Sequence, residues 1–133
     1  MHNVFISYSS IDQLQAETVR GVLEKNGIPC WMAPRDIPGG SNYTKEIPDA
    51  ICNCFAMVVL LSQSAQDSLW VPKEINMALD ENVPVIPFLV DINNPNRQFR
   101  FMLGQCQYIQ SIKDPNSAKH ELISRLKHLQ SID

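Results

Sequence analysis

Short apolar segments alternate with amphipathic ones along the whole chain. Five of them are short, apolar and bounded by turn residues, and we expect these to be strands: residues 3–9, 28–32, 55–62, 83–90 and 106–110. Four others have helical periodicity and predict helices: residues 12–27, 43–54, 68–82 and 116–132. Strand and helix alternate regularly, which favours an α/β fold with an open, five-stranded parallel sheet flanked by helices on both faces.

Apolar residues at helical spacing define the helix faces that we expect to be buried. They are Leu14, Val19, Val22 and Leu23 in the first helix, Val71, Ile75, Ala78 and Leu79 in the third, and Leu122, Ile123, Leu126 and Leu129 in the last. Pro48 predicts a short or kinked second helix, and Pro84 and Pro87 predict strand ends or an exposed backbone edge. We expect residues 91–105 to form a polar loop with one short helical turn.

Length and charge narrow the class of protein. A chain of 133 residues is one domain by length, so we expect a single domain over residues 1–133; whether a longer chain continues beyond it is left open. The net charge of −3, without a basic run, disfavours a nucleic-acid partner. The longest apolar stretch is too short to span a bilayer and no secretory signal opens the chain, so we expect a cytoplasmic protein without a membrane partner.

Cysteine and histidine spacing does not indicate a metal site. The chain has four cysteines: Cys30, Cys52, Cys54 and Cys106. One Cys-x-Cys pair without a second close pair is a poor zinc signature, and we expect small buried residues in a reducing cytosol. His120 and His128 are expected to be solvated on the last helix. No metal and no cofactor are predicted.

Ligands in such sheets bind beyond the carboxyl ends of the strands. Trp70 and Glu74 lie four residues apart near the start of the third helix and therefore at this rim. Ser68 can cap that helix, which places Pro72 in the first turn, where its missing N–H breaks no helical bond. Spacing alone favours a simpler interpretation, in which Trp70 packs at the core edge and Glu74 is a solvated charge near the positive helix end.

Three segments resemble, in order, the motifs of Toll/interleukin receptor (TIR) domains, the prokaryotic ones in particular. They are VFISYSSID, CWMAPRDIPGGSNYTKEIPDAI and VVLLSQSAQDSLWVPKEINMAL. The resemblance covers about the whole chain and implies a five-stranded parallel sheet flanked by helices. It also implies one of two roles: many TIR domains are scaffolds, and others cleave NAD at the nicotinamide–ribose bond, some of them cyclising the ADP-ribose.

The resemblance implies that Glu74 is the catalytic carboxylate. The W-x-x-x-E pattern of catalytic TIR domains is intact from Trp70 to Glu74, and Trp70 would form a wall of the nicotinamide-end pocket. A single carboxylate is consistent with the chemistry, because nicotinamide leaves as a neutral molecule and needs no general acid. Glu74 would stabilise the oxocarbenium-like ribose by charge and hydrogen bonding. NAD is then the substrate.

Tyr8, Ser9 and Ser10 follow the first strand and have two interpretations that both stay open. Ser10 or Asp12 can cap the first helix. The resemblance implies instead that hydroxyls and backbone N–H groups here bind the phosphates or ribose of the substrate. The chain has no Gly-rich phosphate cradle, which disfavours a dehydrogenase or an NTPase.

The predicted loop at residues 33–42 is longer than a simple strand-to-helix connection needs. Arg35 and Asp36 can pair on its surface, and Gly39 with Gly40 suits a turn that needs positive φ. The resemblance implies the BB loop, which TIR domains use in TIR–TIR contacts and at the mouth of the NAD site. Arg35, Asp36 and Ser41 are then candidate substrate contacts.

The sequence therefore predicts an NAD glycohydrolase or cyclase that is activated by TIR–TIR self-association, in immune or anti-phage signalling. The alternative is a non-catalytic TIR scaffold, which has no need of the Trp70–Glu74 pair. A receiver-like domain is disfavoured, because it needs an acidic pair after the first strand and an aspartate after the third. Whether the product is linear or cyclic ADP-ribose is left open.

Overall fold

The strands and helices alternate as the sequence predicts. The computed structural model describes residues 2–33 and 43–133. The strands are β1 (Val4–Ser7), β2 (Cys30–Met32), β3 (Ala56–Leu61), β4 (Val85–Leu89) and β5 (Ile109–Gln110). The helices are η1 (Ser10–Asp12), α1 (Gln13–Lys25), α2 (Tyr43–Cys52), α3 (Gln63–Gln66), α4 (Trp70–Asp80), α5 (Arg97–Met102) and α6 (Pro115–Ser131).

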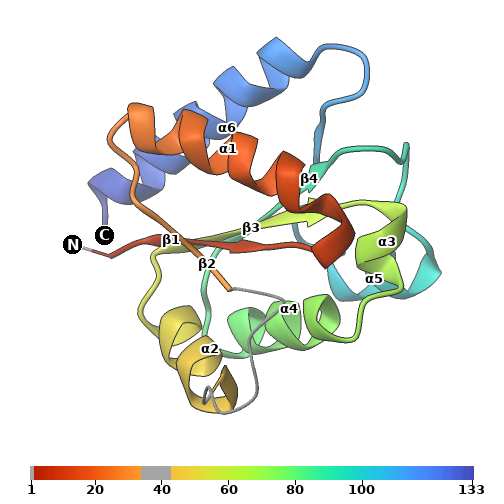
Figure 1. The fold of residues 1–133 in the computed structure, drawn as a ribbon, viewed down its shortest axis with the longest axis horizontal. Helices are drawn as coiled ribbons and strands as arrows, with labels where there is room; N and C mark the ends of the chain where they lie inside the picture. The colour runs from red at the N-terminus through yellow and green to blue at the C-terminus, as the bar shows by residue number, and fades with distance from the viewer. Residues whose placement is uncertain (1, 34–42) are drawn as a thin grey trace.

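All five strands join one parallel sheet in the order β2-β1-β3-β4-β5 (Figure 1). The predicted fold class is therefore confirmed. The central strand β3 is apolar and buried along its whole length, as a parallel strand covered on both faces must be. Because the strands run the same way, the segments that follow them meet at one edge of the sheet. We call this edge the rim.

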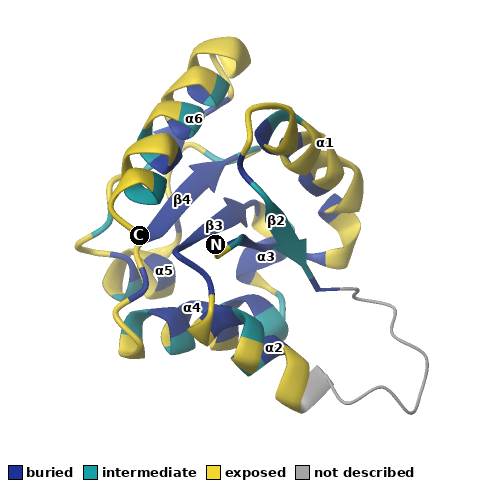
Figure 2. Ribbon diagram, turned by 90° about the vertical axis from the view of Figure 1, so that its left-hand side faces the viewer, coloured by how far each residue is buried: buried dark blue, intermediate teal, exposed yellow. Residues whose placement is uncertain are grey.

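Helices cover both faces of the sheet (Figures 1 and 2). Helices α1 and α6 pack on one face, and α2 and α4, with the short α3 and α5, pack on the other. Successive strand residues supply the two layers in turn: Ile6 belongs to the α1/α6 core, and Phe5 to the α2/α4 core. No helix in residues 2–33 and 43–133 is long and apolar enough to cross a membrane.

Two short helices differ from the prediction. α3 is not predicted, and α5 is longer than the single turn expected in residues 91–105. Each depends on a local cap: Ser62 Oγ accepts from the backbone N–H of Ala65 at 2.9 Å, and Asn96 Oδ1 accepts from that of Phe99 at 3.0 Å. Segments this short contain too few residues to show helical periodicity.

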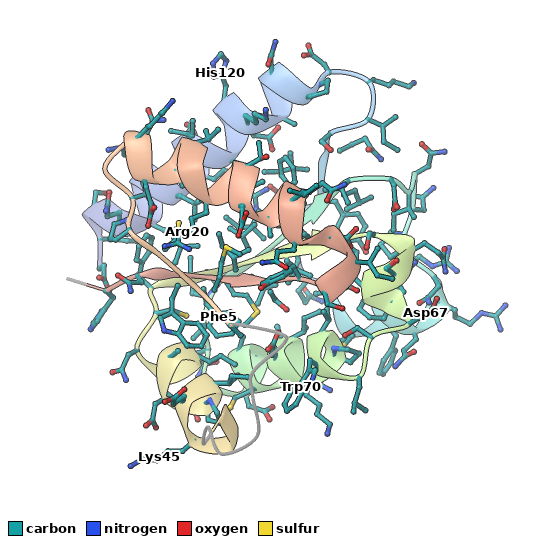
Figure 3. The ribbon with its side chains drawn as sticks, in the orientation of Figure 1. Phe5, Arg20, Lys45, Asp67, Trp70 and His120 are labelled. Carbon is teal, nitrogen blue, oxygen red and sulfur yellow. The ribbon has the colours of Figure 1, made fainter. Side chains whose placement is uncertain are left out.

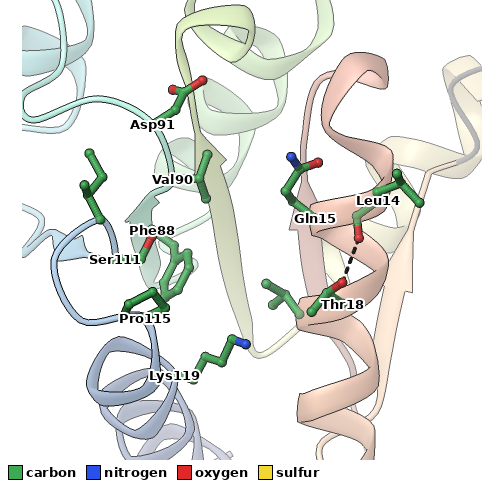
Figure 4. A pocket seen from close by; sticks show the side chains of 11 residues that line it. Leu14, Gln15, Thr18, Phe88, Val90, Asp91, Ser111, Pro115 and Lys119 are labelled. Carbon is green, nitrogen blue, oxygen red and sulfur yellow. Dashed lines mark hydrogen bonds between the residues drawn. The ribbon is translucent and has the colours of Figure 1, made fainter.

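Leu14 is exposed, so the prediction that it is buried is wrong. Its exposed fraction is 78%, whereas Ala16, Val19 and Leu23 form the buried face of α1. α1 begins at the rim after η1, so its first turn extends beyond the end of β1 (Figure 1). There Leu14 helps to line an open cleft of about 630 Å³ between α1, β4 and α6 (Figure 4).

The other predicted helix faces agree with the structure. In α4 and α6 the core positions are fully covered, and those at the edge of each face are half-buried, as Val22 is in α1. The buried residues are Val71, Ile75, Ala78, Leu122 and Leu126, and the half-buried ones are Val22, Leu79, Ile123 and Leu129.

The predictions for Pro84 and Pro87 have different outcomes. Pro84 precedes β4, as predicted, but Pro87 lies inside the strand and is buried. Along a parallel strand, the backbone N–H and C=O groups of successive residues point alternately to the strand on one side and to the strand on the other. The N–H of Val90 donates to Leu61 on the β3 side, so the nitrogen of Pro87 points toward β5, where pairing begins only at Phe88. Pro87 therefore removes no hydrogen bond from the sheet.

The cysteines are free, but they are not all buried. Cys54 is buried, Cys30 and Cys106 are half-buried, and Cys52 is exposed at the end of α2. The expectation of small buried residues is therefore wrong for Cys52. The last residue of an amphipathic helix can face solvent whatever its polarity.

Candidate active site

Ser68 starts α4 in the predicted way. Its Oγ accepts hydrogen bonds from the backbone N–H groups of Trp70 at 3.1 Å and Val71 at 3.3 Å. These are donors that the helix itself cannot satisfy. Pro72 lies in the first turn, where it removes no helical hydrogen bond. Local sequence therefore sets the start of α4 and, with it, the place of Trp70 and Glu74.

Glu74 is a buried carboxylate on the sheet-facing side of α4. It is only 2% exposed and lies on the same helix face as Val71 and Ile75. The hydroxyl of Ser7, the last residue of β1, donates to Glu74 Oε1 at 2.7 Å. The interpretation of Glu74 as a solvated charge near the start of the helix is therefore wrong.

Trp70 lies at the start of α4 and packs half-buried against the α2/α4 core (Figure 3). The ammonium of Lys73, one turn further on, lies 5.6 Å from the centroid of its ring, within range of a cation–π contact. The expectation that Trp70 packs at the core edge therefore holds. It does not exclude a role in a site, because the ring also lines two hollows.

The two hollows meet at Trp70. The first, here called the α2–α4 hollow, has a volume of about 200 Å³ and mainly apolar walls. Its residues are Ile47, Pro48, Ile51, Trp70, Lys73, Glu74 and Met77. The second, here called the rim cleft, has a volume of about 450 Å³. Its residues are Tyr8, Ser9, Ser10, Ile11, Ser64, Asp67, Ser68, Leu69 and Trp70.

The predicted site residues are thus divided between these hollows. Tyr8, Ser9 and Ser10 line the rim cleft, Glu74 lines the α2–α4 hollow, and Trp70 lines both. A mainly apolar space with one carboxylate and one ammonium at its walls suits a flat, weakly polar ring. A cleft with hydroxyls suits a more polar group.

A family model for the TIR domain matches residues 4–126. The chain belongs to the TIR domain family. The fold agrees: the TIR domain of the Toll-related receptor TRR-2 from Hydra magnipapillata superposes with a TM-score of 0.77 at 21% identity, over 98% of this chain and 99% of that one. The RPS4 and RRS1 TIR domain heterodimer gives a TM-score of 0.73 at 16% identity, over 97% and 98%.

A relative in Magallana gigas, described as a stimulator of interferon genes protein, is 29% identical over 96 residues. The match covers 68% of this chain but only 23% of that protein. A solved metazoan TIR-STING receptor from C. gigas, in complex with 2',3'-cGAMP, has a TM-score of 0.70 at 24% identity and covers 93% of this chain and 39% of that one. This TIR domain therefore spans well under half the length of those proteins.

The three side chains that follow β1 in this TIR domain differ in exposure. Tyr8 is 2% exposed and its hydroxyl donates to the backbone carbonyl of Ala33 at 2.6 Å. Ser9 is buried and precedes η1, and Ser10 is exposed in the rim cleft. Ser10 is thus the most accessible of the three hydroxyls. Arg35, Asp36 and Ser41 lie outside the described residues, and their role stays a prediction.

Asp12, one of the two residues predicted to cap the first helix, makes no side-chain capping hydrogen bond to α1. It is buried, and its carboxylate accepts a hydrogen bond from Ser62 Oγ, at the end of β3. Ser62 in turn caps α3. The Asp12 side chain therefore links the segments after β1 and β3 under the rim.

Sequence reasoning missed Ser7, Asp12 and Ser62 as partners in buried hydrogen bonds. One signal pointed to Ser7: it follows the apolar run Val-Phe-Ile and shares the strand face of Phe5. A hydroxyl in such a layer needs a partner. The partners of all three lie 50 or more residues away in the chain, beyond the reach of local spacing.

No metal site is found in the part of the chain that the structure describes. Across residues 2–33 and 43–133, no group of three or more His, Cys, Asp or Glu side chains could hold a metal ion. His120 and His128 are exposed on α6, as predicted.

Proposed function

We propose that this TIR domain cleaves NAD at the nicotinamide–ribose bond, releasing nicotinamide and forming ADP-ribose or a cyclic isomer. One observation carries the proposal: Glu74 is buried beside Trp70 and lines the α2–α4 hollow with it. Burying a carboxylate in an apolar layer is costly unless it is hydrogen-bonded, and the Ser7 hydroxyl holds this one in place.

The reaction needs negative charge near the ribose more than it needs proton transfer. The pyridinium of NAD leaves as neutral nicotinamide with the bonding electron pair, and positive charge develops on the ribose C1′ and ring oxygen. A carboxylate in a poorly solvated space stabilises this charge more strongly than it would in water. Glu74 fits this role. Water, or a ring nitrogen of the adenine, then attacks C1′ and gives the linear or the cyclic product.

The two hollows suggest where each part of NAD binds. The α2–α4 hollow would take the nicotinamide end, with Trp70 as one wall and the apolar side chains of α2 as the other. The nicotinamide ribose would stay beside Glu74, and the rim cleft would take the phosphates and the ribose of the adenosine half, with Ser10 as the accessible hydroxyl. Tyr8 and Ser9 would act here mainly through the backbone and by supporting the cleft wall.

Self-association would complete the site. Both hollows are open, whereas charge stabilisation is strongest where water is excluded. The TIR resemblance implies contacts through residues 33–42, with Arg35, Asp36 and Ser41 at the mouth of the site. Two solved relatives are themselves assemblies: the RPS4 and RRS1 heterodimer and the TIR domains of the activated Roq1 resistosome. Immune or anti-phage signalling and a prokaryotic origin are part of this proposal.

The deciding experiment is incubation of concentrated protein with NAD, followed by chromatography of nicotinamide and ADP-ribose products. We expect nicotinamide release from the wild type and a loss on the order of 10²-fold or more in Glu74→Gln. Glu81→Gln is the matched control, since Glu81 is exposed at the end of the same helix. An active Glu74→Gln variant would refute the catalytic assignment.

A non-catalytic scaffold is the second candidate. It is favoured by large apolar side chains exposed near the rim: Ile11 is 77% exposed and Leu69 is 70% exposed. Exposed apolar side chains can form part of a protein–protein contact. Wild-type protein that associates but releases no nicotinamide at any concentration would favour this role.

A further inference from the structure

Ser7 occupies an unusual position for a polar residue. It is the last residue of β1, is 0% exposed, and lies opposite Val59 in the register with β3. Its neighbours in the α2/α4 layer, Phe5 and Val59, are apolar. An apolar side chain would satisfy the packing of a central strand at this point. A hydroxyl here therefore calls for a specific partner.

That partner is the carboxylate of Glu74. Ser7 Oγ donates to Glu74 Oε1 at 2.7 Å, and both side chains are almost fully buried. The bond joins the end of β1 to α4 across 67 positions of the chain. Hydrogen bonds to a charged group in a poorly solvated place are among the stronger ones in proteins.

We propose that Ser7 is a positioning residue for Glu74. Its hydroxyl holds one carboxylate oxygen against the end of β1 and so sets how the carboxylate faces the α2–α4 hollow. This inference rests on the proposed NAD cleavage and adds a residue to it: Ser7 acts through Glu74 and does not itself line the hollow.

Positioning should affect turnover more than substrate affinity. Small displacements of a charged group reduce the stabilisation of a transition state whose charge develops at one place. Most of the binding surface for NAD, namely the two hollows, would stay in place without the Ser7 hydroxyl. The expected signature is a lower kcat at nearly constant KM.

The test compares Ser7→Ala, which removes the donor, with Ser7→Thr, which keeps it. Ser111→Ala is the matched control: Ser111 is also buried at a strand end and donates to a backbone carbonyl, of Leu89, at 2.6 Å. We expect Ser7→Ala to lower kcat about tenfold or more while changing KM little. Ser7→Thr should recover most of the loss, and Ser111→Ala should keep wild-type kcat.

A spectroscopic measurement tests the contact between Ser7 and Glu74 without requiring NAD cleavage. In protein labelled with ¹³C at glutamate carboxyl carbons, the Glu74 signal is identified by its loss in Glu74→Gln. We expect this signal to move in Ser7→Ala, to return toward the wild-type position in Ser7→Thr, and to stay in place in Ser111→Ala. Thermal unfolding of each variant shows which are folded. If Ser7→Thr fails to fold because of its extra methyl group, the contrast between Ser7→Ala and Ser111→Ala decides, and a Glu74 signal that stays in place in Ser7→Ala overturns the positioning role.

The two arms separate the failure of this inference from that of the proposed function. Wild-type protein without NAD cleavage refutes the proposed function, and an unmoved Glu74 signal in Ser7→Ala then refutes the link between the two residues. Wild-type cleavage with full kcat in Ser7→Ala overturns the positioning role alone. A raised KM with unchanged kcat in Ser7→Ala overturns it as well.

Discussion

The phenol of Tyr8 donates a 2.6 Å hydrogen bond to the backbone carbonyl of Ala33, and both residues are almost completely buried. Tyr8 follows β1 and Ala33 follows β2, so the bond ties two neighbouring strand ends together at the rim. Ala33 is also the first residue of the predicted BB loop and the last described one before residue 43. Tyr8 thus supports the wall of the rim cleft and the point from which this loop departs.

Tyr8→Phe should therefore lower stability. The change leaves the buried carbonyl of Ala33 without its tyrosine donor, at a cost of about 1–2 kcal/mol in the free energy of unfolding. Denaturant unfolding measures this loss. Tyr108→Phe is the control, because the Tyr108 hydroxyl has no hydrogen-bond partner among the described residues. Equal stability of both variants would show that the Tyr8 hydroxyl contributes nothing.

NAD cleavage should require an aromatic ring at position 70, and not only a side chain that fills the space. It packs on the core and lines both hollows, so Trp70→Ala removes packing and pocket wall together. We expect Trp70→Phe to retain clearly more NAD cleavage than Trp70→Ala, by about fivefold, since stacking on an aromatic ring contributes about 1 kcal/mol.

Stability measurements on both Trp70 variants separate the two roles of the ring. Activity is compared per folded molecule, at a temperature where each variant is folded. If turnover falls equally in both variants and in step with their thermal stability, Trp70 is core packing only.

Self-association should raise activity. If a second copy encloses the substrate, nicotinamide release per molecule should increase with protein concentration or with a crowding agent. Substitutions at Arg35, Asp36 or Gly40 should lower activity at moderate concentration and weaken assembly in sedimentation. Constant activity per molecule from dilute monomer to concentrated protein would show instead that one chain contains the complete site.

Cys52 should be the thiol that reacts first with an alkylating reagent. It is exposed, and although desolvation and the nearby Glu81 and Asp49 raise its pKa, burial raises that of Cys30 to about 12 and that of Cys54 to about 11. The thiolate is the reacting form, so a raised pKa leaves these two thiols protonated near neutral pH, and only strongly alkaline solution would ionise them.

Peptide mass mapping after brief alkylation of native protein measures this order, and unfolded protein, in which all four cysteines should react, is the control. Cys52→Ser should abolish the fast phase. Early modification of Cys54 would mean that the end of α2 opens readily.

The site could be predicted in part, because some of its geometry is local. Ser68 caps the helix, and four-residue spacing brings Trp70 and Glu74 together on it, so both follow from neighbouring residues. The rim location of the pair follows from strand–helix alternation, since parallel strands place their carboxyl ends on one edge. Sequence did not reveal that Glu74 is buried.

The fold class, most of each helix face and the Trp70–Glu74 pair could be predicted from sequence, because each depends on patterns among residues within a few positions of one another. The hydrogen bonds from Ser7 to Glu74 and from Ser62 to Asp12, and the exposure of Leu14, became known only from the folded chain. These outcomes depend on which strands are neighbours, on their register, and on where each helix passes the sheet edge. Such long-range geometry is set by the packing of the whole domain and produces no periodic pattern of apolar residues within any one segment.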